Sequence, residues 1–125
     1  MANPKVLIVD DEPDIVESIR FNLESEDIDC VEANDGEEAL FQAKMAVPDL
    51  ILLDVMLPKM NGYEVCRILK YDEEREHIPV IMLTSRTQDT DKLMGERVSA
   101  DEYVCKPFVM DELVSMVKKY LNTSK

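Results

Sequence analysis

The sequence predicts an α/β protein built on a parallel β-sheet that is covered by helices on both faces. Three apolar runs, at residues 6–9, 50–53 and 80–83, contain no polar residue, and strands of this kind are buried on both sides of a parallel sheet. Amphipathic segments of helical length separate these runs, as in βαβ crossovers. Because the chain has only three glycines and no Gly/Ser/Pro-rich linker, we expect short loops and one domain over residues 1–125.

The first half of the chain predicts two strands, each followed by a helix. A helix opens after the first strand at Glu12-Pro13, because proline suits the first helical position. Its apolar face is formed by Ile15, Val16, Ile19 and Leu23. The second strand, from Ile28 to Ala33, mixes acidic and apolar residues and therefore suits a sheet edge. The second helix begins at Asp35, which can cap it, and Glu38 is placed to complete a capping box.

The second half predicts three more strands and three more helices. Asn61 starts a helix after the third strand, and its core-facing stripe is expected to be Val65, Ile68 and Leu69. Charged residues interrupt the apolar stripe of the segment Thr90 to Val98, which is the least regular of the predicted helices. A short strand, Tyr103 to Cys105, suits the other sheet edge. The last helix runs from Val109 to Leu121, with an inward face of Leu113, Val114, Val117 and Leu121.

Composition limits the classes of function that are open to the chain. With 27 acidic against 14 basic residues the formal charge is −13, which argues against direct binding to nucleic acid or to an anionic membrane. The three cysteines have no metal-binding spacing and indicate reduced thiols. No stretch resembles a membrane span or a signal peptide, so we expect a cytoplasmic protein.

Polar side chains follow four of the predicted strands, at the point where each strand ends. They are Asp10 and Asp11, Asp54, Thr84 and Lys106. Because open α/β sheets bind ligands beyond the carboxyl ends of their strands, we expect these side chains to meet at one rim. Three crowded aspartates repel one another unless a cation lies between them. Oxygen ligands without His or Cys favour a hard ion, and Mg²⁺ accepts few protein ligands, so the sequence predicts a magnesium site.

Four motifs in order along the chain closely resemble the receiver domain of two-component response regulators. They are Val6-Leu7-Ile8-Val9-Asp10-Asp11-Glu12, Asp54-Val55-Met56-Leu57-Pro58-Lys59-Met60-Asn61-Gly62, Leu83-Thr84-Ser85-Arg86 and Ala100-Asp101-Glu102-Tyr103-Val104-Cys105-Lys106-Pro107-Phe108. The resemblance covers essentially the whole chain. It implies a flavodoxin-like sheet of order 2-1-3-4-5, in which the first and third strands are neighbours.

The resemblance also implies a role for each residue of the rim. Asp54 is expected to accept a phosphoryl group from a sensor histidine kinase or a phosphotransfer protein. Asp10, Asp11 and Asp54, with the backbone carbonyl of Met56, are expected to bind Mg²⁺, for which Mn²⁺ can substitute. Lys106 is expected to contact the phosphoryl oxygens. The peptide bond between Lys106 and Pro107 is expected to be cis.

Thr84 and Tyr103 resemble the residue pair that carries the signal away from the phosphorylation site. On phosphorylation the hydroxyl of Thr84 is expected to bond the phosphoryl group, and the ring of Tyr103 to follow into the vacated space. The surface of helix 4, strand 5 and helix 5 would then change and control a partner protein or an output domain. The resemblance implies a switch with slow self-catalysed phosphorylation and dephosphorylation rather than an enzyme that turns over a substrate.

Three alternatives remain open at the level of sequence. Phosphatases with an aspartyl nucleophile need a second aspartate two residues later, where this chain has Met56. A flavodoxin-type electron carrier shares the topology, but the chain has no tryptophan to stack on a flavin. The third is a receiver that mediates protein contacts without phosphorylation. Regulators that dimerise on DNA carry an arginine where this chain has Met116 and an acidic residue where it has Val98. These two positions therefore favour a receiver outside that group.

Overall fold

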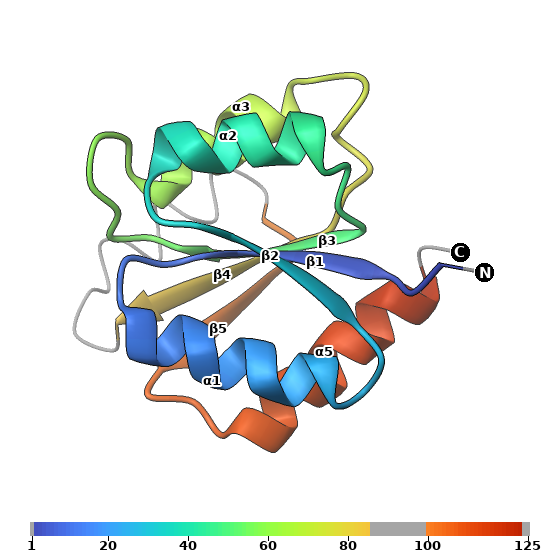
Figure 1. Cartoon of the computed structure of the whole chain (residues 1–125). Helices are drawn as coiled ribbons and strands as arrows, with labels where there is room; N and C mark the ends of the chain where they lie inside the picture. Colours follow the sequence, from blue (N-terminus) through green and yellow to red (C-terminus); the bar gives the residue numbers. More distant parts are fainter. Residues whose placement is uncertain (1, 86–99, 124–125) are drawn as a thin grey trace.

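A computed structural model describes residues 2–85 and 100–123 and shows a five-stranded parallel sheet (Figure 1). The strand order is β2-β1-β3-β4-β5, as the sequence predicted. The strands are β1 (Lys5–Val9), β2 (Asp29–Ala33), β3 (Leu50–Asp54), β4 (Val80–Ser85) and β5 (Glu102–Lys106). The two strands of mixed composition, β2 and β5, form the two edges, as expected.

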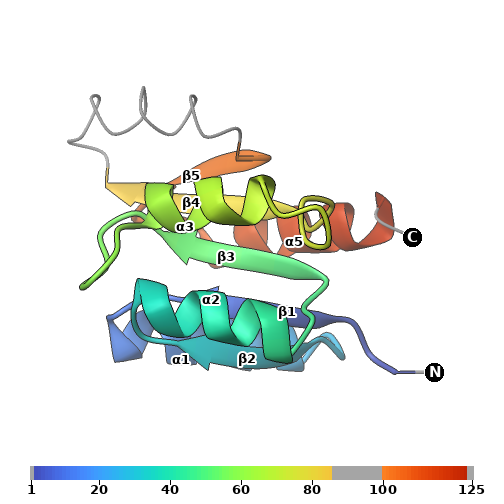
Figure 2. The same ribbon diagram turned by 90° about the horizontal axis from the view of Figure 1, so that it is seen from above.

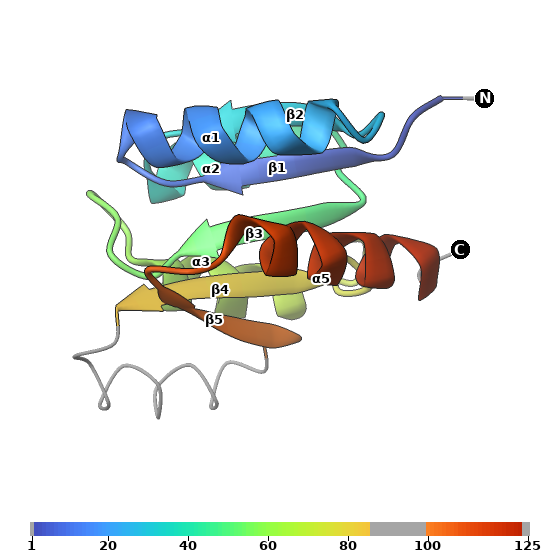
Figure 3. The same ribbon diagram turned by 90° about the horizontal axis from the view of Figure 1, so that it is seen from below.

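Helices cover both faces of the sheet. They are α1 (Pro13–Glu24), α2 (Gly36–Met45), α3 (Gly62–Lys70) and α5 (Met110–Thr123). Helices α2 and α3 lie on one face (Figure 2), and α1 and α5 lie on the other (Figure 3). The predicted helix Thr90 to Val98 lies outside the described residues.

The three central strands are buried on both sides. Every residue of the apolar runs 6–9, 50–53 and 80–83 is fully buried. Alternate residues of these strands enter two separate hydrophobic clusters, one under α2 and α3 and the other under α1 and α5. A strand with two buried faces cannot shift its register without exposing apolar side chains, so the ends of β1, β3 and β4 are fixed relative to one another.

The helix starts follow the sequence signals. Pro13 is the first residue of α1, and the side chain of Asp35 accepts the backbone N–H of Glu38 at 2.8 Å. Glu38 accepts the N–H of Asn34 rather than that of Asp35, so the capping box is shifted by one residue. Asn61 caps α3 by accepting the N–H of the residue three positions later at 3.0 Å.

One predicted core position of α3 is wrong. Ile68 is 46% exposed, whereas Val65 and Leu69 are buried as expected. The buried face instead includes Tyr63 and Cys66. The apolar face is therefore rotated about the helix axis from the predicted one, and α3 begins at Gly62, whose backbone packs directly on the end of β3.

Because the strands are parallel, their register brings all the carboxyl ends to the same end of the sheet. Val9 pairs with Leu53 across β1 and β3, and Ser85 pairs with Lys106 across β4 and β5. The chain leaves β1 towards α1 on one face and leaves β3 towards α3 on the other (Figure 1). The two connections thus diverge to opposite faces of the sheet, and ligands of open α/β sheets bind beyond the carboxyl ends of the strands at such a point.

Within residues 2–85 and 100–123, no helix has both the length and the apolar composition needed to cross a lipid bilayer. The longest helix, α5, has 14 residues and begins with acidic side chains. A transmembrane helix needs about 20 predominantly apolar residues.

Helix α3 offers a matched pair of substitutions that tests its orientation. Leu69→Ala should lower the free energy of unfolding by about 2–4 kcal/mol, because it leaves a cavity at a buried position. Ile68→Ala removes the same number of atoms from an exposed site and should cost less than about 1 kcal/mol. Urea unfolding followed by far-UV circular dichroism measures both values. Equal losses would contradict the orientation described here.

Candidate functional site

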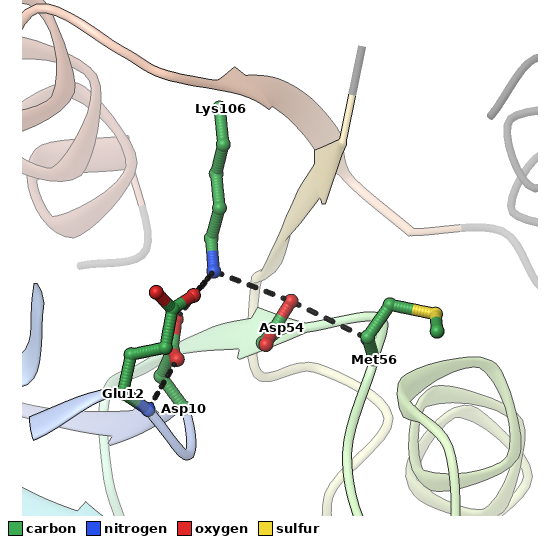
Figure 4. Close-up of polar contacts among 5 residues, drawn as sticks. All are labelled: Asp10, Glu12, Asp54, Met56 and Lys106. Atoms are coloured by element: carbon green, nitrogen blue, oxygen red, sulfur yellow. Dashed lines mark hydrogen bonds and ion pairs between the residues drawn. The ribbon is translucent and has the colours of Figure 1, made fainter. Parts of the chain in front are cut away.

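Two buried aspartates lie close together at the carboxyl ends of β1 and β3 (Figure 4). Asp10 directly follows β1 and is fully buried, and Asp54 is the last residue of β3 and 4% exposed. Backbone N–H groups fix both carboxylates: Glu12 donates to Asp10 at 2.9 Å and Met56 donates to Asp54 at 3.3 Å. The side chains are therefore positioned by the strand ends and by the loops that follow them.

Lys106 joins the two aspartates from the far side of the site. It is the last residue of β5, and its ammonium lies 2.8 Å from the Asp10 carboxylate and 3.5 Å from that of Asp54 (Figure 4). Its side chain is 17% exposed. The predicted cis peptide bond between Lys106 and Pro107 is confirmed.

Glu12 belongs to this site, although the sequence reasoning assigned it only to the start of a helix. It occupies the N-cap position of α1, but its side chain makes no capping hydrogen bond. The carboxylate instead lies 3.2 Å from the Lys106 ammonium. An acid directly after the Asp10-Asp11 pair was the only signal in the sequence, and it fits a helix start equally well.

The acidic side chains form a cluster suited to a hard cation. One carboxylate oxygen from each of Asp10, Asp11, Glu12 and Asp54 lies within 4.8 Å of the others. An all-oxygen set is the chemistry that Mg²⁺ prefers, and Mg²⁺ commonly uses one or two carboxylates and keeps several waters. Met56 is the second residue of the loop after β3, and its N–H already bonds Asp54. The residues present therefore fit a divalent cation.

Burial and neighbouring charges shift the pKa values of Asp54 and Lys106. Burial, and after it the charge of Asp10, raises the pKa of Asp54 to about 6, against the lowering effect of Lys106. Burial alone would lower the pKa of Lys106. The hydrogen bond to Asp10 and the charges of Asp54 and Asp10 outweigh that effect, so the pKa of Lys106 is raised above its ordinary value.

Thr84 lies on the strand next to Asp54, and Tyr103 lies on the strand beyond that one. Thr84 is in β4, which runs between β3 and β5, and it is 5% exposed. Tyr103 is in β5, where its Cα pairs with that of Met82, and its partly buried ring packs against the cluster under α2 and α3. Thr84 is therefore near the carboxyl ends of the strands, whereas Tyr103 lies two residues further from them, at the level of Met82.

The sequence places this chain among well-characterised proteins. The family model described as the response regulator receiver domain matches residues 6–118. The chain is 45% identical over 123 residues to the alkaline phosphatase synthesis transcriptional regulatory protein PhoP of Bacillus subtilis, covering 98% of this chain and 50% of that protein. It is 40% identical over 121 residues to the DNA-binding response regulator MtrA of Mycolicibacterium smegmatis, covering 97% and 52%. The chain thus spans about half the length of these relatives, one of which is named a transcriptional regulatory protein and the other a DNA-binding response regulator.

Solved structures show the same fold. The signal receiver domain of a signal transduction histidine kinase from Syntrophus aciditrophicus matches with a TM-score of 0.93 at 34% identity, covering 98% of this chain and 92% of that one. The chemotaxis response regulator CheY4 of Vibrio cholerae matches with a TM-score of 0.87 at 31% identity, covering 95% and 99%. From the family match, the relatives and the fold together, the chain belongs to the response regulator receiver domain family.

Proposed function

We propose that this chain is a cytoplasmic, phosphorylation-dependent signalling switch in which Asp54 accepts the phosphoryl group. The observation that carries the proposal is the position of Asp54 at the end of β3, where the Lys106 ammonium contacts both its carboxylate and that of Asp10. Of the described carboxylates within 4 Å of the Lys106 ammonium, which are those of Asp10, Glu12 and Asp54, only that of Asp54 belongs to the last residue of a strand. The family membership of the chain agrees with this assignment.

The transfer requires alignment and charge neutralisation more than covalent chemistry. An oxygen of Asp54 attacks phosphorus as the bond from phosphorus to the donor histidine nitrogen breaks, and the nitrogen keeps the electron pair. The transition state is loose, with charge spread over the phosphoryl oxygens. Lys106 lies 3.5 Å from Asp54 and supplies one positive charge to those oxygens.

A divalent cation is the remaining requirement. Asp10, Asp11 and Asp54, with the backbone carbonyl of Met56, are the residues we propose to hold Mg²⁺ or Mn²⁺, and the ion would neutralise charge on the transferred group. The acidic cluster supports this proposal. The receiver domain of the sensor histidine kinase PA1611 from Pseudomonas aeruginosa, a structural neighbour at a TM-score of 0.88 and 27% identity that covers 97% of this chain and 99% of that one, has a magnesium ion in its active-site cleft.

We propose that Thr84 and Tyr103 convey the modified state to the surface of β5 and α5. The buried hydroxyl of Thr84 lies on the strand next to Asp54 and can bond a phosphoryl oxygen after a small movement. Reversing a two-state ratio from 1:99 to 99:1 needs about 5.5 kcal/mol. Hydrogen bonds to charged groups contribute about 1.5–3 kcal/mol each, so the bonds made by Thr84 and Lys106 are of the right size.

The partners we propose are a histidine kinase or phosphotransfer protein and a downstream protein or output domain. A groove of about 310 Å³ beside Lys106, lined partly by Ile15, Pro107 and Phe108, offers apolar contact to a phosphodonor. We treat residues 1–125 as one receiver domain. Its net charge of −13 makes direct contact with nucleic acid or an anionic membrane unfavourable, and the chain acts as an acceptor rather than as an enzyme with a turnover substrate.

The first test is the intact mass of the chain after incubation with acetyl phosphate and Mg²⁺. We expect one added phosphoryl group on the wild type, none on Asp54→Asn, and none when EDTA removes the metal. Asp29→Asn is the matched control, because Asp29 is an exposed acid at the opposite end of the sheet, and it should be phosphorylated like the wild type. An adduct that persists on Asp54→Asn would contradict the proposal.

A second test uses the raised pKa of Asp54, about 6 in the folded chain against 3.8 for the ordinary group. Between these values the unfolded chain releases the proton while the folded chain retains it, so rising pH favours unfolding. In metal-free buffer, Asp54→Asn should be more stable than the wild type by about 3 kcal/mol at pH 8, and this difference should disappear as the pH falls to 4. Urea unfolding in EDTA measures the difference.

Two further results complete that test. Mg²⁺ binds only the folded wild type in this proposal, so adding it at pH 8 should close the gap to Asp54→Asn. A difference in the free energy of unfolding between Asp54→Asn and the wild type that stays constant from pH 4 to pH 8 would mean that folding does not raise the pKa of Asp54.

A further inference from the structure

The loop between β3 and α3, residues 55–61, is packed between two segments of backbone. On one side Gly62 donates its N–H to the carbonyl of Val55 at 2.8 Å, and a Cβ on Gly62 would lie only 2.3 Å from the carbonyl oxygen of Asp54. On the other side lies Gly36, the first residue of α2. A Cβ there would lie 2.4 Å from the carbonyl oxygen of Met60 and 2.6 Å from its Cβ. Figures 1 and 2 both show this loop beside the start of α2.

The first turn of α2 is itself held firmly, so it cannot move away from the loop at low cost. The side chain of Asp35 caps the helix by accepting the N–H of Glu38, and Glu38 in turn accepts the N–H of Asn34 at 2.6 Å. Gly36 is buried. Added bulk at this position therefore displaces the loop, because the atom it meets is a backbone oxygen and not the end of a flexible side chain.

Lys59, near the tip of the loop, makes a second link to the same turn. Its backbone has a φ of 69°, a left-handed conformation that is unfavourable for a residue with a Cβ. Such conformations persist where the surroundings impose them. The Lys59 ammonium lies 3.6 Å from the Asp35 carboxylate and 3.9 Å from that of Glu37.

We propose that the first turn of α2 positions the β3–α3 loop for cation binding, with Gly36 and Lys59 as positioning residues. The inference rests on the proposed function, in which this loop supplies the Met56 carbonyl. Met56 is already tied to Asp54 through its N–H at 3.3 Å, while the residues after it depend on contacts with α2. The packing at Gly36 therefore sets where the carbonyl lies relative to the carboxylates, although α2 contributes no residue to the acidic cluster described above.

Gly36→Ala is the direct test. In metal-free protein, amide resonances of Met56 to Asn61 should shift in ¹⁵N–¹H spectra, while those of Asp10 and Asp11 stay in place. Calorimetric titration should give a dissociation constant for Mg²⁺ at least fivefold higher than that of the wild type. The matched control is Ala43→Gly, which changes α2 at another buried position and lowers its helix propensity but adds nothing against the loop, and it should bind Mg²⁺ like the wild type.

If Gly36→Ala does not fold, Lys59→Gln tests the same positioning role through its affinity for Mg²⁺. Removing a positive charge near an acidic site would by itself tighten cation binding. The positioning role requires the opposite, a dissociation constant about two- to threefold higher, restored by Lys59→Arg. Unchanged or tighter Mg²⁺ binding by Lys59→Gln, or wild-type binding by a folded Gly36→Ala, would overturn the inference. Failure of the wild type to bind Mg²⁺ would instead overturn the proposed function.

Discussion

The site depends on carboxylates held together against their mutual repulsion. Asp10, Asp11, Glu12 and Asp54 each place an oxygen within 4.8 Å of the others, and Lys106 supplies a single compensating charge among the described residues. The free energy that keeps them there comes from elsewhere in the fold. The central strands are buried on both faces, and burial of that extent outweighs a few kcal/mol of electrostatic strain. The buried strands therefore stabilise the molecule, whereas the carboxylates at the carboxyl ends of the strands destabilise it by repelling one another.

That arrangement separates the parts of the chain that hold the fold from those that can respond to a ligand. The strand ends are fixed by register, whereas the loops after β1 and β3 leave in opposite directions and contact α1, α2 and α3. Lys106 is shared among three carboxylates at distances from 2.8 to 3.5 Å, so a new anion on Asp54 can draw it over by a small movement. Movement of the Lys106 ammonium alone thus requires no change in the two hydrophobic clusters.

The sequence predicted those features that follow from local pattern. Apolar runs located the buried strands, capping residues located the helix starts, and the motifs located Asp10, Asp54 and Lys106, which the fold brings together. It failed where the outcome depends on contacts between distant segments. Ile68 has the spacing of a core residue, but the face of α3 that packs against the sheet is the one that carries Tyr63 and Cys66. Two other contacts likewise leave no periodic signal in the sequence. They are the ion pair between Lys106 and Glu12 and the close packing of Gly36 on Met60.

The contact between Lys106 and Asp10 joins residues 96 positions apart. Closing a loop of this length costs entropy that local structure does not cost. The first and last strands must both be in place before the ammonium reaches the carboxylates. A nascent or partly unfolded chain that lacks β5 therefore has the acidic residues without their counter-charge. Only the finished domain presents the full arrangement of charges to a phosphodonor.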